Sequence, residues 1–148
     1  MRATTVIFLA VAAPVVLTVP ARAQPASAIQ AYLRKTNATC EIDSYKVVYR
    51  GPLAGATSAV TVATFGVDAC GGGNNGGGAF GIFSLQDGAV REWKQVPPPE
   101  GRVAGVSVRG SRIIVVWRNW KQSDPMCCPS LVHTTVYALK GGQAVQTR

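Results

Sequence analysis

Two adjacent cysteines, Cys127 and Cys128, are the residues of this chain whose types and spacing are best suited to chemistry. They lie in the segment Asp124–Ser130, where Pro125 and Pro129 frame them. Each proline fixes its own φ and biases the preceding residue toward extended geometry, which predicts a stiff, non-helical loop. Because successive side chains of an extended chain point in opposite directions, we expect the two sulfur atoms to face different neighbours.

The chain has two other cysteines, Cys40 and Cys70, and this even number favours disulfides in an exported protein. We predict a double staple in which Cys127 and Cys128 are bonded to Cys40 and Cys70, with the order left open. The alternative pairing, Cys127 with Cys128 and Cys40 with Cys70, requires a strained ring between neighbours and ranks lower. No free thiol is expected in either case.

Metal and redox chemistry are the alternatives for these cysteines. A zinc site requires paired cysteine or histidine ligands, and the chain has one histidine, so we predict no metal and no cofactor. Met126 beside the two cysteines is soft enough for Cu(I), but only if the thiols stay reduced. Reactive thiols also need nearby cations, and Lys121 is the one basic residue close in sequence. A thiol-redox or copper-handling role for Cys127 and Cys128 therefore remains the alternative function.

A hydrolase would need a nucleophile, a base and an orienting group. His133 lies in the middle of a predicted strand, and Ser130, three residues earlier, falls on the opposite side of that strand. The acidic residues form no recognisable motif, and Asp124 before Pro125 is typical of a turn. We therefore predict that the chain is not an enzyme.

The N-terminus has the pattern of a secretory signal peptide. A positive Met1-Arg2 precedes the apolar run Val6–Val19, and Ala21-Arg22-Ala23 supplies small residues for cleavage. The apolar run is shorter than the roughly 20 residues that cross a bilayer, so no transmembrane anchor is expected. We predict cleavage after Ala23, removal of residues 1–23, and a single periplasmic or secreted domain over residues 24–148.

The chain is basic, with 15 Lys and Arg against 7 Asp and Glu and a formal net charge of +8. The basic residues are scattered, and their longest run is Arg34-Lys35. Export and the lack of a basic stripe argue against nucleic acid. We expect an envelope protein or an anionic envelope component as partner.

The pattern of apolar residues predicts an α+β, mainly β fold with one N-terminal helix. Ser27 and Gln30 fit a capping box, apolar residues follow at helical spacing, and Asn37 is a plausible stop. The rest of the chain shows about eight short strands that form an antiparallel meander, either one sheet or a sandwich. Asp87-Gly88, Arg109-Gly110 and Gly141-Gly142 predict tight turns between strands. The strands are expected at Tyr45–Tyr49, Ser58–Val67, Ala79–Gln86, Ala89–Val96, Val103–Val108, Ser111–Trp117, Leu131–Lys140 and Ala144–Thr147.

A glycine-rich stretch, Cys70–Gly78, connects two predicted strands. It lacks the Lys-Ser/Thr of a phosphate-binding loop and precedes a strand, so we do not expect it to bind phosphate. Asn74 and Asn75 in its centre favour a turn, although their amides could bind a ligand. Candidate binding residues on this stretch and on the double-cysteine loop are Asn74, Asn75, Asp124, Met126 and Ser130.

The two stretches Cys70–Asn75 and Asp124–Ser130, in this order with a hairpin between them, resemble small exported bacterial proteins of the LppP/LprE lipoprotein type. The likeness covers roughly residues 44–148. This chain lacks the lipid-acceptor cysteine of those lipoproteins, and the resemblance implies location and fold but no established activity. We therefore expect a non-catalytic envelope protein, a binding or inhibitor module that presents its disulfide-held loops to a partner.

Overall fold

The computed structural model describes residues 25–68, 77–93 and 101–147. The predicted signal peptide over residues 1–23 lies outside the described residues, as do Cys70, Asn74 and Asn75. Within the described ranges the chain has one helix and eight strands. In order they are α1 (Pro25–Thr36), β1 (Glu41–Gly51), β2 (Val60–Asp68), β3 (Gly77–Gln86), β4 (Ala89–Trp93), β5 (Arg102–Arg109), β6 (Arg112–Asn119), β7 (Leu131–Lys140) and β8 (Gln143–Thr147).

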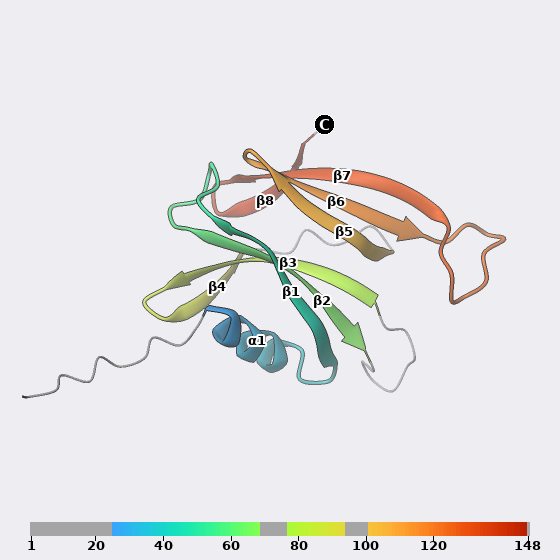
Figure 1. Cartoon of the computed structure of the whole chain (residues 1–148), viewed down its shortest axis with the longest axis horizontal. Coiled ribbons are helices and arrows are strands. Elements are labelled where there is room, and N and C mark those ends of the chain that lie inside the picture. Colours follow the sequence, from blue (N-terminus) through green and yellow to red (C-terminus); the bar gives the residue numbers. More distant parts are fainter. Residues whose placement is uncertain (1–24, 69–76, 94–100, 148) are drawn as a thin grey trace, which may run out of the picture.

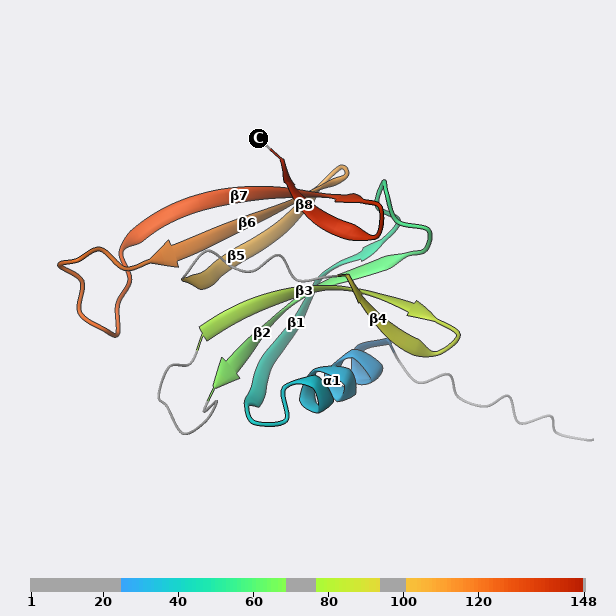
Figure 2. The ribbon, with the colours of Figure 1, turned by 180° about the vertical axis from the view of Figure 1, so that it is seen from behind.

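The strands form two four-stranded sheets, each paired in chain order. Sheet A has the order β1-β2-β3-β4 and sheet B the order β5-β6-β7-β8, and every pairing is antiparallel. The predicted mainly-β fold is confirmed, and the open choice between one sheet and a sandwich is decided in favour of a sandwich. Figure 1 shows three layers, with sheet B on one face of sheet A and α1 on the other face. The reverse view in Figure 2 shows the same order of layers.

Two of the three predicted tight turns are confirmed, whereas the turn predicted at Arg109-Gly110 lies one residue later, at Gly110-Ser111, because Arg109 pairs with Arg112. Asp87 and Gly88 have φ values of 52° and 80°, and Gly141 and Gly142 have φ values of 54° and 78°. Positive φ at both central residues is the geometry of a two-residue hairpin that matches strand twist. Glycine and aspartate accept that geometry, which is why these dipeptides connect β3 to β4 and β7 to β8.

Sheet A is buried on both faces, and β2 shows this most clearly. Val60 and Val62 pack between the sheets, in a core that includes Ile113, Val115 and Trp117 of sheet B. The alternate residues Ala63 and Phe65 belong to a second core. Since side chains alternate across a strand, one apolar run supplies both cores.

The second core holds α1 against sheet A. Ile29 and Leu33, one helical turn apart, are fully buried against Ala63, Phe65 and Phe83. The hydroxyl of Tyr32 donates a 2.8 Å hydrogen bond to Glu92 Oε2. Burial, with help from this bond, raises the pKa of Tyr32 to about 12.

The helix ends where the sequence predicts but begins earlier. The backbone N–H and side-chain amide of Asn37 both donate to the Leu33 carbonyl at 2.9 Å, which ends the helix after Thr36. The predicted cap at Ser27 is wrong, because the helix already begins at Pro25. Proline suits the first helical position, where its missing N–H has no intrahelical acceptor. No helix in the described ranges is long and apolar enough to cross a bilayer.

We predict that Leu33→Ala lowers the free energy of unfolding by about 2–5 kcal/mol, because it leaves a cavity in the core between α1 and sheet A. Arg34→Ala, on the exposed side of the same helix, is the matched control and should change stability by less than about 0.5 kcal/mol. Urea unfolding followed by circular dichroism measures both variants. Equal losses for the two variants would contradict the packing role assigned to Leu33.

Candidate functional site

The loop between β6 and β7 carries the two adjacent cysteines. It covers residues 120–130 and projects from one end of sheet B, at the right of Figure 1. β1, β3 and β5 begin at this end of the sandwich, and β2 and β6 end there. The loop therefore lies at an end where strand termini from both sheets gather.

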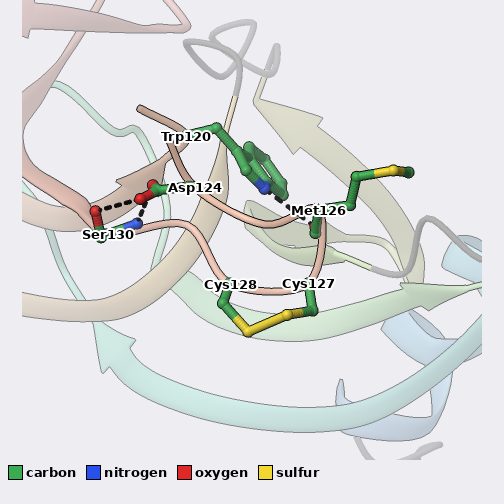
Figure 3. Close-up of a disulfide and its surroundings, with 6 residues drawn as sticks. All are labelled: Trp120, Asp124, Met126, Cys127, Cys128 and Ser130. Carbon is green, nitrogen blue, oxygen red and sulfur yellow. Dashed lines mark hydrogen bonds between the residues drawn. A yellow bond between two sulfur atoms is a disulfide. The ribbon is translucent and has the colours of Figure 1, made fainter. Parts of the chain in front are cut away.

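Cys127 and Cys128 are bonded to each other, with their Cα atoms 3.8 Å apart (Figure 3). The predicted double staple is therefore wrong, and the lower-ranked pairing is present. The physical reason is that the backbone is not extended here. The N–H of Cys128 donates to the Pro125 carbonyl at 3.0 Å, so the chain turns and brings both sulfur atoms to one side.

Cys40 is also disulfide-bonded, and no cysteine in the described part of the chain is a free thiol. The Cys127–Cys128 bond leaves Cys70 as the one remaining cysteine within the chain, and Cys70 lies outside the described residues. The expectation of no free thiols is thus confirmed for Cys40, Cys127 and Cys128.

Asp124 organises the loop, as Figure 3 shows. Its Oδ2 accepts hydrogen bonds from the backbone N–H groups of Lys121 at 2.8 Å and Ser130 at 2.7 Å. Its Oδ1 accepts a hydrogen bond from the Ser130 hydroxyl at 2.8 Å. These donors favour the carboxylate, so the pKa of Asp124 lies below its usual range, with the backbone bond from Lys121 as the largest cause. Asp124 is more than a turn initiator, because it ties the two ends of the loop together.

Trp120 supports the opposite side of the loop. Its Nε1 donates a 3.1 Å hydrogen bond to the Met126 carbonyl. The guanidinium of Arg102, at the start of β5, lies over the Trp120 ring at 5.3 Å from the ring centre. A cation over an indole face is attracted by the ring quadrupole. Neither Trp120 nor Arg102 was predicted from the sequence; a tryptophan shortly after a predicted strand was the available signal for Trp120.

Exposed apolar side chains gather at this loop. Met126 is 86% exposed, Val132 56%, Leu131 47% and Trp120 40%. One other large apolar side chain is exposed in the described ranges, that of Val145, at 40%. Single exposed apolar residues are ordinary, but four of these five lie within residues 120–132. We call Trp120, Met126 and Val132 the loop patch; Leu131, which precedes Val132 on β7, points to the other face of sheet B.

The predicted site residues therefore divide into two groups. The structure brings Asp124, Met126 and Ser130 together with both loop cysteines, while Asn74 and Asn75 lie outside the described residues. Ser130 donates its hydroxyl proton to Asp124, and His133 stacks on Trp117 with ring centres 6.3 Å apart. The Ser130 hydroxyl and the His133 ring are thus each engaged in a structural contact. Among the residues described, no three or more His, Cys, Asp or Glu side chains form a group that could hold a metal ion.

Comparison of the chain with protein-family models, with curated proteins and with solved structures finds no match.

We predict that removing the Cys127–Cys128 bond hardly changes global stability. A disulfide stabilises chiefly by closing a chain loop in the unfolded state, and this bond joins residues with a sequence separation of 1. The double variant Cys127→Ser/Cys128→Ser should therefore unfold within about 1 kcal/mol of the parent. The double variant Cys40→Ser/Cys70→Ser should lose about 2–5 kcal/mol.

Denaturant unfolding compares the two variants, and peptide mapping without reduction checks the bond itself. Loss of several kcal/mol from the Cys127→Ser/Cys128→Ser variant would show that this bond holds the fold as well as the loop. A mapped peptide joining Cys127 or Cys128 to Cys40 would restore the double staple.

The order of the loop should depend on pH, because protonation of the Asp124 carboxylate removes the hydrogen bonds that it accepts. Because the folded-state pKa is lowered, the hydrogen bonds stabilise the loop above the unfolded pKa of about 3.9 and are lost as pH falls through the folded value. The amide signals of Lys121 and Ser130 in NMR spectra should therefore shift together below about pH 4. Asp124→Asn should remove this transition and Asp87→Asn, in the β3–β4 turn, should preserve it. A transition that survives in Asp124→Asn would assign it to another group.

Proposed function

We propose that this protein is an exported, non-catalytic envelope module that binds a protein partner through the loop patch. The observation that carries the proposal is the concentration of exposed apolar side chains on and beside one braced loop. Aromatic residues and methionine are enriched at the centres of protein interfaces. A loop on a β scaffold is also a usual position for a binding surface.

The loop is preorganised, which favours recognition. The Asp124 hydrogen bonds, the bond from Trp120 to Met126 and the Cys127–Cys128 bond hold its conformation before any partner arrives. A binding surface that is already ordered loses less conformational entropy on association. The short disulfide therefore has a role here that it does not have in global stability, because it fixes the tip of the loop.

The charges around the loop patch indicate the chemistry of the partner. Arg118 is exposed and pairs in register with Val132, Lys121 is exposed on the loop, and Arg102 lies over Trp120. A basic rim around an apolar centre is complementary to a partner with an apolar patch and an acidic rim. Location in the periplasm or outside the cell is part of the proposal, supported by the signal-peptide pattern before Gln24 and by the resemblance to LppP/LprE-type proteins.

The test is site-specific photocrosslinking from Gln122, an exposed loop residue outside the loop patch, in the envelope of producing cells. We expect one discrete adduct, whose yield falls about tenfold or more with Val132→Lys or Met126→Lys because these place a charge in an apolar interface. Val145→Lys is the matched control, since Val145 has the same exposed fraction as Trp120 but lies on β8. No discrete adduct, or equal loss with the control, would refute the proposed interface.

A second function is favoured by one specific observation, the exposure of both bonded cysteines at the loop tip. A partner thiolate attacks one sulfur to form a mixed disulfide and releases the other as a thiolate. A second thiol of that partner then resolves the mixed disulfide, so the partner leaves oxidised and Cys127 and Cys128 become a dithiol. In the crosslinking test, a Cys127→Ser/Cys128→Ser variant that keeps its adduct supports binding without redox chemistry. A cysteine-dependent mixed disulfide in place of the adduct supports thiol exchange.

A further inference from the structure

A recess lies at the same end of the sandwich as the loop patch, between sheet A and the edge strand β5 of sheet B. It is a cleft of about 710 Å³. Its walls come from β1, β2 and β3 on one side and from residues 102–106 of β5 on the other. This volume is in the range of roughly 300–1,000 Å³ that is usual for ligand sites.

The cleft exists because the apolar alternation of sheet A stops before the strands do. On β2, Val60 and Val62 fill the space between the sheets, but the next positions on that face are Thr64 and Gly66. Gly66 pairs in register with Gly78 of β3, so two neighbouring positions have no side chain. A Cβ atom at Gly78 would lie 2.6 Å from the Val103 carbonyl oxygen, so β3 approaches β5 closely at this position.

Charged groups of both signs line the cleft. Asp43, Asp68 and Lys46 are on the sheet A wall. The guanidinium of Arg102, at the start of β5, lies over Trp120 on the face of sheet B that carries Arg118. Asp43 and Asp68 belong to the adjacent strands β1 and β2, where Asp43 lies opposite Gly66 and its carboxylate rests against that glycine. The side chains of Asp43, Lys46 and Asp68 make no hydrogen bond or ion pair with any other described residue.

The rim of the cleft is also irregular. The register of β1 against β2 shifts between Asp43 and Lys46, and Ser44 within this bulge has a φ of 49°. A positive φ is unfavourable for serine, and bulges and strained residues concentrate at binding sites, where they redirect side chains. Here the bulge separates Asp43 from Lys46 along the edge of the cleft.

We propose that this cleft binds a short peptide with free termini. The two carboxylates on the sheet A wall suit the ammonium group, and the ammonium of Lys46, on the other side of the bulge, suits the terminal carboxylate. Edge strands β1 and β5 carry backbone groups that an extended peptide can pair with, and Val103 and Val106 offer apolar contact to its side chains.

The probes are di-, tri- and tetra-alanine, each also prepared with an acetylated N-terminus or an amidated C-terminus. Calorimetry with the oxidised protein should detect binding of at least one free peptide. Acetylation and amidation should each weaken it about tenfold or more, since each removes a charge-assisted contact. Equal affinity for free and doubly blocked peptides, or no binding of any length, would overturn the proposal.

Variants test which charged residue of the cleft binds each peptide terminus. Asp43→Asn should weaken the free peptide but have little further effect on the acetylated one, and Lys46→Gln should show the same relation with the amidated one. Arg109→Gln, at the opposite end of β5, is the control and should leave affinity unchanged. Val132→Lys distinguishes this site from the loop patch, because it should remove the crosslinked partner and leave peptide affinity intact. If a variant weakens the free and the blocked peptides equally, the substituted charge affects binding only through the fold.

Discussion

The double burial of sheet A is the constraint on which the rest of this structure depends. Both faces of β2 are buried over Val60–Phe65, through Val60 and Val62 on one face and Ala63 and Phe65 on the other, so the sheet is stable only when each face is covered. Sheet B covers one face and α1 covers the other, through separate cores. A helix as short as α1 is marginal in isolation, and its order comes from this packing more than from its own hydrogen bonds.

The two ends of the sandwich differ because large apolar side chains fill the space between the sheets at one end only. At the end that carries the β1–β2 connection, Leu53 of that connection enters the core between the sheets, and Gly55 lies against the Leu139 backbone. At the other end, Thr64 and Gly66 replace branched apolar residues, which leaves room for the cleft. The loop patch lies at this end too, and the contact of Arg102 with Trp120 links the two surfaces.

Most of the fold could be predicted from local chemistry. The helix stop at Asn37 and the turns at Asp87-Gly88 and Gly141-Gly142 depend on neighbouring residues alone, and all are confirmed. The contact of Arg102 with Trp120 could not be predicted, because it joins β5 to the loop after β6. The cleft was also beyond prediction, since it depends on how β5 lies across sheet A.

The error over Cys127 and Cys128 shows where local reasoning stops being sufficient. Alternation of side chains holds for an extended chain, but the hydrogen bond from Cys128 to Pro125 turns the backbone within the loop. Because of that turn, the Cys127–Cys128 disulfide and the disulfide of Cys40 have different roles. A bond between adjacent residues restricts almost nothing in the unfolded chain, so it can only shape the loop or exchange with thiols. Stabilisation by loop closure then depends on the disulfide of Cys40, whose side chain is only half-buried, at the junction of α1 with β1.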